Sequence, residues 1–182
     1  MLVGLFIVHA LLVVVTIVAA VIDWRTGHIP NWLTIPLLVI GPVFWLIFDL
    51  RTSGHPDLFY WSLAGLVGCA IVPLIMFRKN AMGGGDVKLF MGIGAVGTLP
   101  LGIEAQLLAC IAGALFALGQ LAWQGKLFTT VGNAFFLGLN PVLPKKWRRE
   151  IKPELLNKVR FGGAIAFGTA LAVLLAHQRL WI

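Results

Sequence analysis

The sequence contains little charge and almost no cysteine. Only 12% of its 182 residues are charged and 59% are hydrophobic, a balance that excludes an ordinary soluble domain and indicates a polytopic membrane protein. The two cysteines, Cys69 and Cys110, lie in separate apolar stretches and form no CxxC pair, so neither a zinc site nor a disulfide framework is supported. We expect no metal and no cofactor. No lysine or arginine precedes Arg25, so the first apolar stretch lacks the positive start of a cleaved signal peptide, and we expect a retained helix.

The apolar stretches predict an all-α membrane protein with six transmembrane helices and no soluble domain. A spanning helix needs about 20 mostly apolar residues. We place the spans at about residues 2–22, 32–48, 58–77, 87–100, 103–123 and 161–181, within one integral-membrane domain over residues 1–182. Residues 124–160 contain the basic run 145–149. We expect this segment to lie along the cytoplasmic membrane surface and to contact anionic lipid headgroups.

Basic residues fall almost entirely on one side of this six-span plan. Arg25 lies in the first loop, and the basic residues Arg78, Lys79 and Lys88 flank the third loop. Eight more lie in the fifth loop: Lys126, Lys145, Lys146, Arg148, Arg149, Lys152, Lys158 and Arg160. The positive-inside rule then places these loops in the cytoplasm and both termini on the non-cytoplasmic side. Such clusters report topology and lipid contact, so we expect no nucleic-acid partner.

Three local patterns predict how the helices end and pack. Small residues recur at every fourth position of the fifth span, which favours close helix packing. They are Ala105, Ala109, Gly113 and Ala117. Asn31 follows Pro30 and is expected to cap the second helix. Pro100 predicts a turn between the fourth and fifth spans.

Two aspartates lie at the predicted cytoplasmic edge of the membrane. Asp23 ends the first span, and Asp86 follows the glycine run 83–85 where the fourth span begins. A carboxylate there is costly unless it faces protein or a water-filled cavity. Glycines let the backbone turn sharply and let another chain approach closely. We expect the two helices to pack together so that the acids meet. The alternative is that both acids are solvated flanks, since a Gly-x-Gly-Asp tetrapeptide is often only a turn.

Two close carboxylates can hydrolyse a peptide bond without a metal or a nucleophilic side chain. They repel each other's ionisation and tend to share one proton. One then acts as a base on water, and the other donates a proton to the carbonyl oxygen or the leaving amine. Asp23 and Asp86 are the predicted catalytic pair, with Gly83 and Gly85 shaping the loop. Lys88 either touches the substrate or tunes the pair, or else its ammonium reaches the lipid headgroups.

These motifs resemble those of the type IV prepilin peptidases, which are aspartic membrane proteases with a GxGD motif. The likeness rests on residues 23–25, 29–31 and 83–88, and the six-span plan extends it across the chain. It implies that Asp23 and Asp86 are the catalytic aspartates. It also implies that the partners are prepilin or pseudopilin leader peptides. These are cleaved at the cytoplasmic face of the inner membrane, usually just after a glycine.

The sequence differs from the longer members of that family in one respect that bears on the expected activity. Those members carry paired CxxC motifs and also methylate the new amino terminus, whereas this chain begins at the first span and lacks such cysteines. It is similar to the short, peptidase-only branch that serves Flp (tight-adherence) pili, so we expect no methyltransferase activity. The archaeal preflagellin peptidases share the reaction. Presenilin-like proteases also use GxGD but place the first aspartate in a different motif.

Two other classes of protein fit the same residues. A small proton-coupled carrier would use the aspartates as a relay, although carriers normally bind cargo near the membrane midplane and both acids lie near one surface. A non-catalytic subunit of a pilus or secretion assembly would tolerate the change Asp23→Asn.

Overall fold

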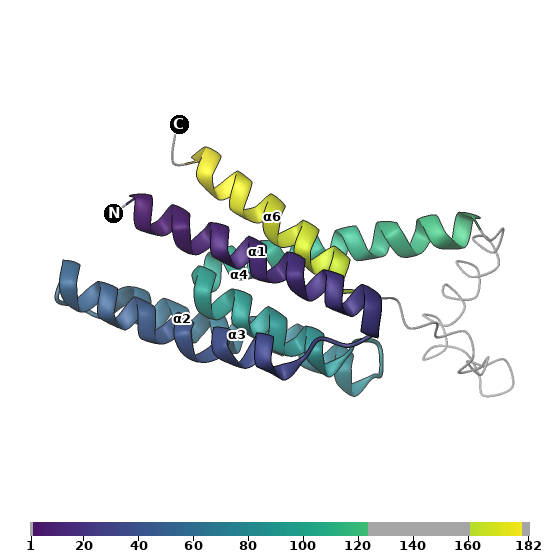
Figure 1. Cartoon of the computed structure of the whole chain (residues 1–182), viewed down its shortest axis with the longest axis horizontal. Coiled ribbons are helices and arrows are strands. Elements are labelled where there is room, and N and C mark those ends of the chain that lie inside the picture. Colours follow the sequence, from purple (N-terminus) through teal and green to yellow (C-terminus); the bar gives the residue numbers. More distant parts are fainter. Residues whose placement is uncertain (1, 124–160, 180–182) are drawn as a thin grey trace, which may run out of the picture. The chain divides into compact units, whose positions relative to one another are not determined.

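The computed structural model describes residues 2–123 and 161–179, and all regular elements in these ranges are helices (Figure 1). They are α1 (Leu2–Thr26), α2 (Asn31–Thr52), α3 (Asp57–Arg78), α4 (Gly84–Trp123) and α6 (Gly162–Arg179). The prediction of an all-α fold is therefore confirmed for the described residues. Residues 124–160, predicted to lie on the membrane surface, are outside them.

Four of the described helices are long and apolar enough to cross a membrane, as expected of a multi-pass membrane protein. They are α1 from Gly4, α2, α3, and α4 as far as Gln120. The predicted spans 87–100 and 103–123 fall within the single element α4, and α6, with 18 residues, is not among the four. The count of six spans and the sides of the two termini stay predictions.

Helix α4 is broken at Thr98, two residues before Pro100. The backbone there has φ 65° and ψ 172°, which is not helical, so α4 consists of two helical segments. Proline has no N–H to continue the helical hydrogen bonds, and its ring clashes with the carbonyl group four residues earlier, which for Pro100 is that of Val96. The predicted turn near Pro100 is therefore present as a break at Thr98.

The break leaves two carbonyl groups of α4 to be paired from other helices. The fourth residue after Val96 is Pro100, which has no N–H, and Trp45 Nε1 of α2 donates to the Val96 oxygen at 2.8 Å. Ser62 Oγ of α3 donates to the Ala95 oxygen at 2.5 Å. Irregular backbone within an apolar region is tolerated where protein groups satisfy it.

Helix α6 packs antiparallel to α1. Its first residue, Gly162, contacts Asp23 near the end of α1. Near its own end, the ring of His177 lies 5.4 Å from that of the buried His9, which is near the start of α1. The start of α1 and the end of α6 therefore lie at the same end of this helix pair (Figure 1).

Three residues of the small-residue stripe of α4, Ala105, Ala109 and Gly113, pack against α6 and the residue before it, and the sequence predicted close packing without naming the partner helix. Ala105 and Ala109 are fully buried, and a side chain on Gly168 of α6 would collide with their backbone. A side chain on Gly113 would collide with the ring of Phe161. These contacts bring the backbones of α4 and α6 close together.

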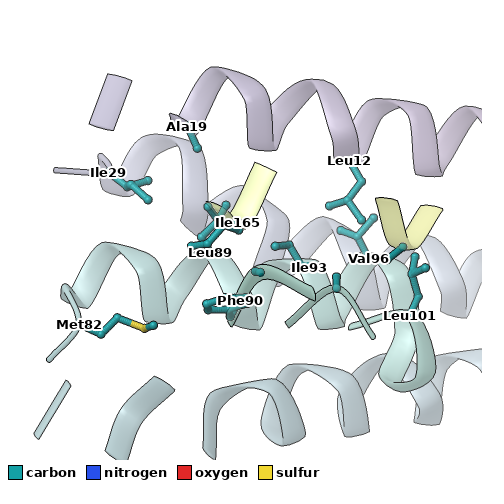
Figure 2. Packing of buried hydrophobic residues seen from close by; sticks show 13 residues of the cluster. Leu12, Ala19, Ile29, Met82, Leu89, Phe90, Ile93, Val96, Leu101 and Ile165 are labelled. Carbon is teal, nitrogen blue, oxygen red and sulfur yellow. The ribbon is translucent and has the colours of Figure 1, made fainter. Parts of the chain in front are cut away.

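Buried hydrophobic residues of α1, α4, α6 and the loops before α2 and α4 form one cluster (Figure 2). Leu89, Phe90 and Ile93 of α4 are fully buried in it, together with Ile165 of α6. Ala19 of α1 and Ile29 of the loop between α1 and α2 belong to the same cluster. The first segment of α4 is thus the centre of the packed core.

The chain divides into two compact units. The first comprises Met1–Gly113 and Arg160–Ile182, and it contains every residue of the candidate site below. The second comprises Ala114–Val159, of which the structure describes residues 114–123, the end of α4.

Candidate active site

Asp23 is buried in the last turn of α1. Helix α1 continues to Thr26, so Asp23 is a helical residue, and it is only 6% exposed. Its Oδ2 accepts a hydrogen bond of 3.1 Å from the backbone N–H of Gly162, the first residue of α6. A buried carboxylate must be hydrogen-bonded or paired, and Asp23 meets this requirement through the start of another helix. It is not a solvated flank.

Asp86 is buried in the first turn of α4. Its residue is 9% exposed, and its Oδ2 accepts a hydrogen bond of 3.2 Å from the backbone N–H of Gly83. Gly83 immediately precedes the helix, so Asp86 reaches back to satisfy one of the N–H groups that a helix start leaves unpaired. A Cβ on Gly83 would lie only 3.1 Å from that oxygen. The glycine run thus lets the loop close tightly over the Asp86 carboxylate.

Gly85 is the point where the loop after α1 meets the start of α4. A Cβ on Gly85 would lie 2.9 Å from the Cβ of Ile29 and 3.0 Å from the Ile29 carbonyl oxygen. Only glycine allows this approach of two backbones. The residue before Asp86 therefore contacts the loop that follows Asp23.

A hydrogen bond between Lys88 and Asn31 joins the same two segments. Lys88 Nζ donates to Asn31 Oδ1 at 2.8 Å, between residues 57 positions apart. The prediction that Asn31 caps α2 was wrong, because Pro30 occupies the cap position and no side chain caps the helix. The Asn31 amide instead faces Lys88, so the ammonium is held by protein at the start of α4.

His28 and Arg25 follow Asp23 in the chain, near the end of α1. His28 and Arg25 are exposed, and the ring Nδ1 of His28 lies 3.5 Å from the Thr26 oxygen in its own loop. Among the described residues, no group of three or more His, Cys, Asp or Glu side chains is arranged to hold a metal ion. The site therefore offers two buried carboxylates on segments that contact each other.

The sequence did not identify Gly162 as part of this site. In the sequence it is only a small residue near the start of an apolar stretch. Its contact with Asp23 is made by a backbone N–H, and the two residues are 139 positions apart. A backbone donor has no side-chain signature. The adjacent glycines, Gly162 and Gly163, where the last helix begins were the one available signal.

Comparison with known proteins points to one family. Residues 10–118, which include Asp23 and Asp86, match the model of the type IV leader peptidase family. The chain is 35% identical over 80 residues to the preflagellin peptidase of Methanococcus maripaludis, covering 44% of this chain and 34% of that protein. It is 31% identical over 133 residues to the prepilin leader peptidase/N-methyltransferase of Escherichia coli, covering 68% of this chain and 56% of that protein. The chain thus spans about a third of the length of the preflagellin peptidase and about half of the length of the prepilin leader peptidase. No solved structure matches the chain.

Proposed function

Because this chain belongs to the type IV leader peptidase family, we propose that it is a membrane-embedded aspartic endopeptidase. Its substrates are prepilin-like proteins, from which it removes the basic leader at the cytoplasmic face of the inner membrane. The relatives named as prepilin and preflagellin peptidases support this class of substrate. Within these 182 residues no CxxC pair occurs, so the proposal covers leader cleavage and not methylation.

One observation carries the proposal: two buried aspartates lie on segments that touch. Asp23 is 6% exposed and Asp86 is 9% exposed, and Gly85, next to Asp86, packs against Ile29 of the loop after Asp23. Lys88 and Asn31 join the same segments by a hydrogen bond. Buried carboxylates on adjoining elements are suited to sharing a proton.

In the proposed reaction, the aspartate that has lost its proton takes one from water, and the water attacks the scissile carbonyl. At the same time the other aspartate gives its proton to the carbonyl oxygen. As the intermediate collapses, the first aspartate passes the proton taken from water to the leaving amine, and the second takes back a proton from a hydroxyl of the intermediate. Base and acid are therefore roles that the two aspartates share between them. The backbone N–H groups of Gly162 and Gly83 hold one oxygen of each carboxylate. The folded protein thus fixes one oxygen of each carboxylate before the substrate arrives.

The test is a cleavage assay in membranes with a matched set of aspartate variants. Asp23→Asn and Asp86→Asn keep an oxygen that accepts the bonds from Gly162 and Gly83 but lose the ionisable group. We expect each to lower the rate of leader removal by about 10²- to 10⁴-fold, the usual contribution of a general acid or base. The readout is the mobility of the leader-bearing band across a panel of prepilins.

Asp49→Asn is the matched control for these two variants. Asp49 is even more buried, at 2% exposed, and its Oδ2 accepts a hydrogen bond of 2.9 Å from the N–H of Phe59. It lies near the end of α2, away from the contact between Ile29 and Gly85. We expect full activity from this variant. Normal cleavage by Asp23→Asn or Asp86→Asn would contradict the dyad and favour the carrier or assembly-subunit alternative.

A further inference from the structure

The first residue of α6 holds the carboxylate of Asp23, although α6 is outside the segment that matches the family. That segment ends at residue 118, and α6 begins at Gly162. The Gly162 N–H donates to Asp23 Oδ2 at 3.1 Å, and this hydrogen bond is buried. A helix start leaves its first N–H groups without partners in the helix. The Gly162 N–H therefore has its partner in Asp23 and none within α6.

The side of Gly162 that faces Asp23 has no room for a side chain. A Cβ at this position would lie 2.9 Å from both Oδ2 and Cβ of Asp23, and 3.2 Å from its Cγ. Separations under 3.0 Å are essentially absent for real Cβ atoms, so one of the two groups would have to move. The neighbouring Gly163 has nothing within 4 Å of an added Cβ. The steric requirement for glycine is thus specific to position 162.

The start of α6 is also fixed to α4, the helix that carries Asp86. The ring of Phe161 lies against Gly113, and its centroid is 6.4 Å from that of the fully buried Phe90. Ile165, one turn into α6, is fully buried in the same cluster (Figure 2). A displacement of residue 162 would therefore meet a packed core on one side and Asp23 on the other. Because protein interiors are close-packed, a shift of residue 162 would be passed on to the Asp23 carboxylate.

We propose that Gly162 is a positioning residue for the dyad, and this inference rests on the proposed function. Its N–H selects the orientation of the Asp23 carboxylate, and its missing side chain lets that carboxylate lie against the start of α6. The C-terminal helix then completes the active site, since it holds Asp23 while packing on the helix of Asp86. A misplacement of about 1 Å in a catalytic constellation can cost about 10²-fold in rate.

The kinetic test compares Gly162→Ala with Gly163→Ala. We expect Gly162→Ala to lower kcat for leader cleavage by about 10- to 100-fold with KM within about twofold of the parent value, because Asp23 moves while substrate contacts stay. Gly163→Ala should match the parent in both constants. Each kcat is normalised to the folded fraction, measured by thermal unfolding in detergent. Unchanged kcat in Gly162→Ala, or a loss no larger than the loss of folded protein, would overturn the role.

A second measurement tests the contact without relying on activity. Hydrogen exchange at the Gly162 amide should be slow in the parent and in Asp23→Asn, which keeps an acceptor, and fast in Asp23→Ala. Asp49→Ala is the control and should leave this amide protected. Equal exchange in Asp23→Ala and the parent would overturn the hydrogen bond itself. An inactive parent overturns both proposals, whereas an active parent with a fully active Gly162→Ala overturns only the role of Gly162.

Discussion

Each of the three buried aspartates in the described residues accepts a hydrogen bond from a backbone N–H at the start of a helix. Asp23 pairs with Gly162, Asp49 with Phe59, and Asp86 with Gly83. All three donors belong to the set that a helix cannot satisfy internally. Hydrogen bonding alone therefore does not distinguish a catalytic aspartate from a structural one. What distinguishes Asp23 and Asp86 is that their segments contact each other at Ile29 and Gly85.

The hydrogen bond between Lys88 and Asn31 yields a residue-scale prediction. If it keeps the two aspartate segments in register, Lys88→Met and Asn31→Ala should each slow leader cleavage, and the double variant should be no slower than the worse single one. The expected coupling is about 0.5–1.5 kcal/mol in activation free energy, since groups in direct contact are not additive. The measurement is a double-mutant cycle on kcat/KM.

Strictly additive effects of the two substitutions would contradict a role for Lys88 through its hydrogen bond with Asn31. They would mean that the ammonium acts through substrate or lipid headgroups and not through Asn31. Lys79→Met is a suitable control, because Lys79 is an exposed cation near the same loop and should not couple to Asn31→Ala.

At the scale of the element, α4 depends on its neighbours because it is broken. Its first segment is the most buried part of the residues that the structure describes, and a side chain on Gly65 of α3 would collide with the backbone of Gly94. The positive φ of Thr98 is costly for a β-branched residue. The break persists because Trp45 and Ser62 pair the carbonyls that it frees. The first segment of α4, the second half of α2 and the first half of α3 therefore depend on one another.

Loss of the Trp45 indole N–H should destabilise this part of the fold and leave the aspartates in place. Trp45→Phe keeps the aromatic packing but leaves the buried Val96 carbonyl without its partner, at a cost of about 1–3 kcal/mol in the free energy of unfolding. Trp61→Phe is the control, since Trp61 is 50% exposed on α3 and should have little effect. Thermal unfolding of both variants in the same detergent checks this, and equal melting temperatures would contradict the assigned role of Trp45.

For the whole molecule, the sequence predicted the helical fold better than the contacts between the helices. Composition was sufficient for an all-α membrane fold, because a chain this apolar has few alternatives. Asp23 and Asp86 were identifiable because acids are rare here, seven in 182 residues. The partners of Asn31 and Asp23 were not, since Lys88 and Gly162 lie 57 and 139 positions away. Pro100 indicated a turn, but not that Thr98 would adopt the positive φ.

The orientation of the molecule in the membrane is a separate prediction, and two exposed histidines allow a matched test. His28 lies before α2 and His55 after it, so the two are on opposite sides if α2 spans the membrane. The excess of lysine and arginine predicts that His28 lies on the cytoplasmic side. A membrane-impermeant maleimide should therefore label His55→Cys in intact cells and His28→Cys only in inverted vesicles. The parent, with Cys69 and Cys110, sets the background.

The opposite labelling pattern would contradict the proposal that cleavage takes place at the cytoplasmic face. Ile29, one residue after His28, contacts Gly85, so the label on His28→Cys reports the side on which both aspartate segments lie. A prepilin leader that has not crossed the membrane could then not reach Asp23 and Asp86. Labelling of both variants in intact cells would instead show that α2 does not span the membrane. The topology experiment thus tests where the substrate meets the dyad, independently of whether cleavage is observed.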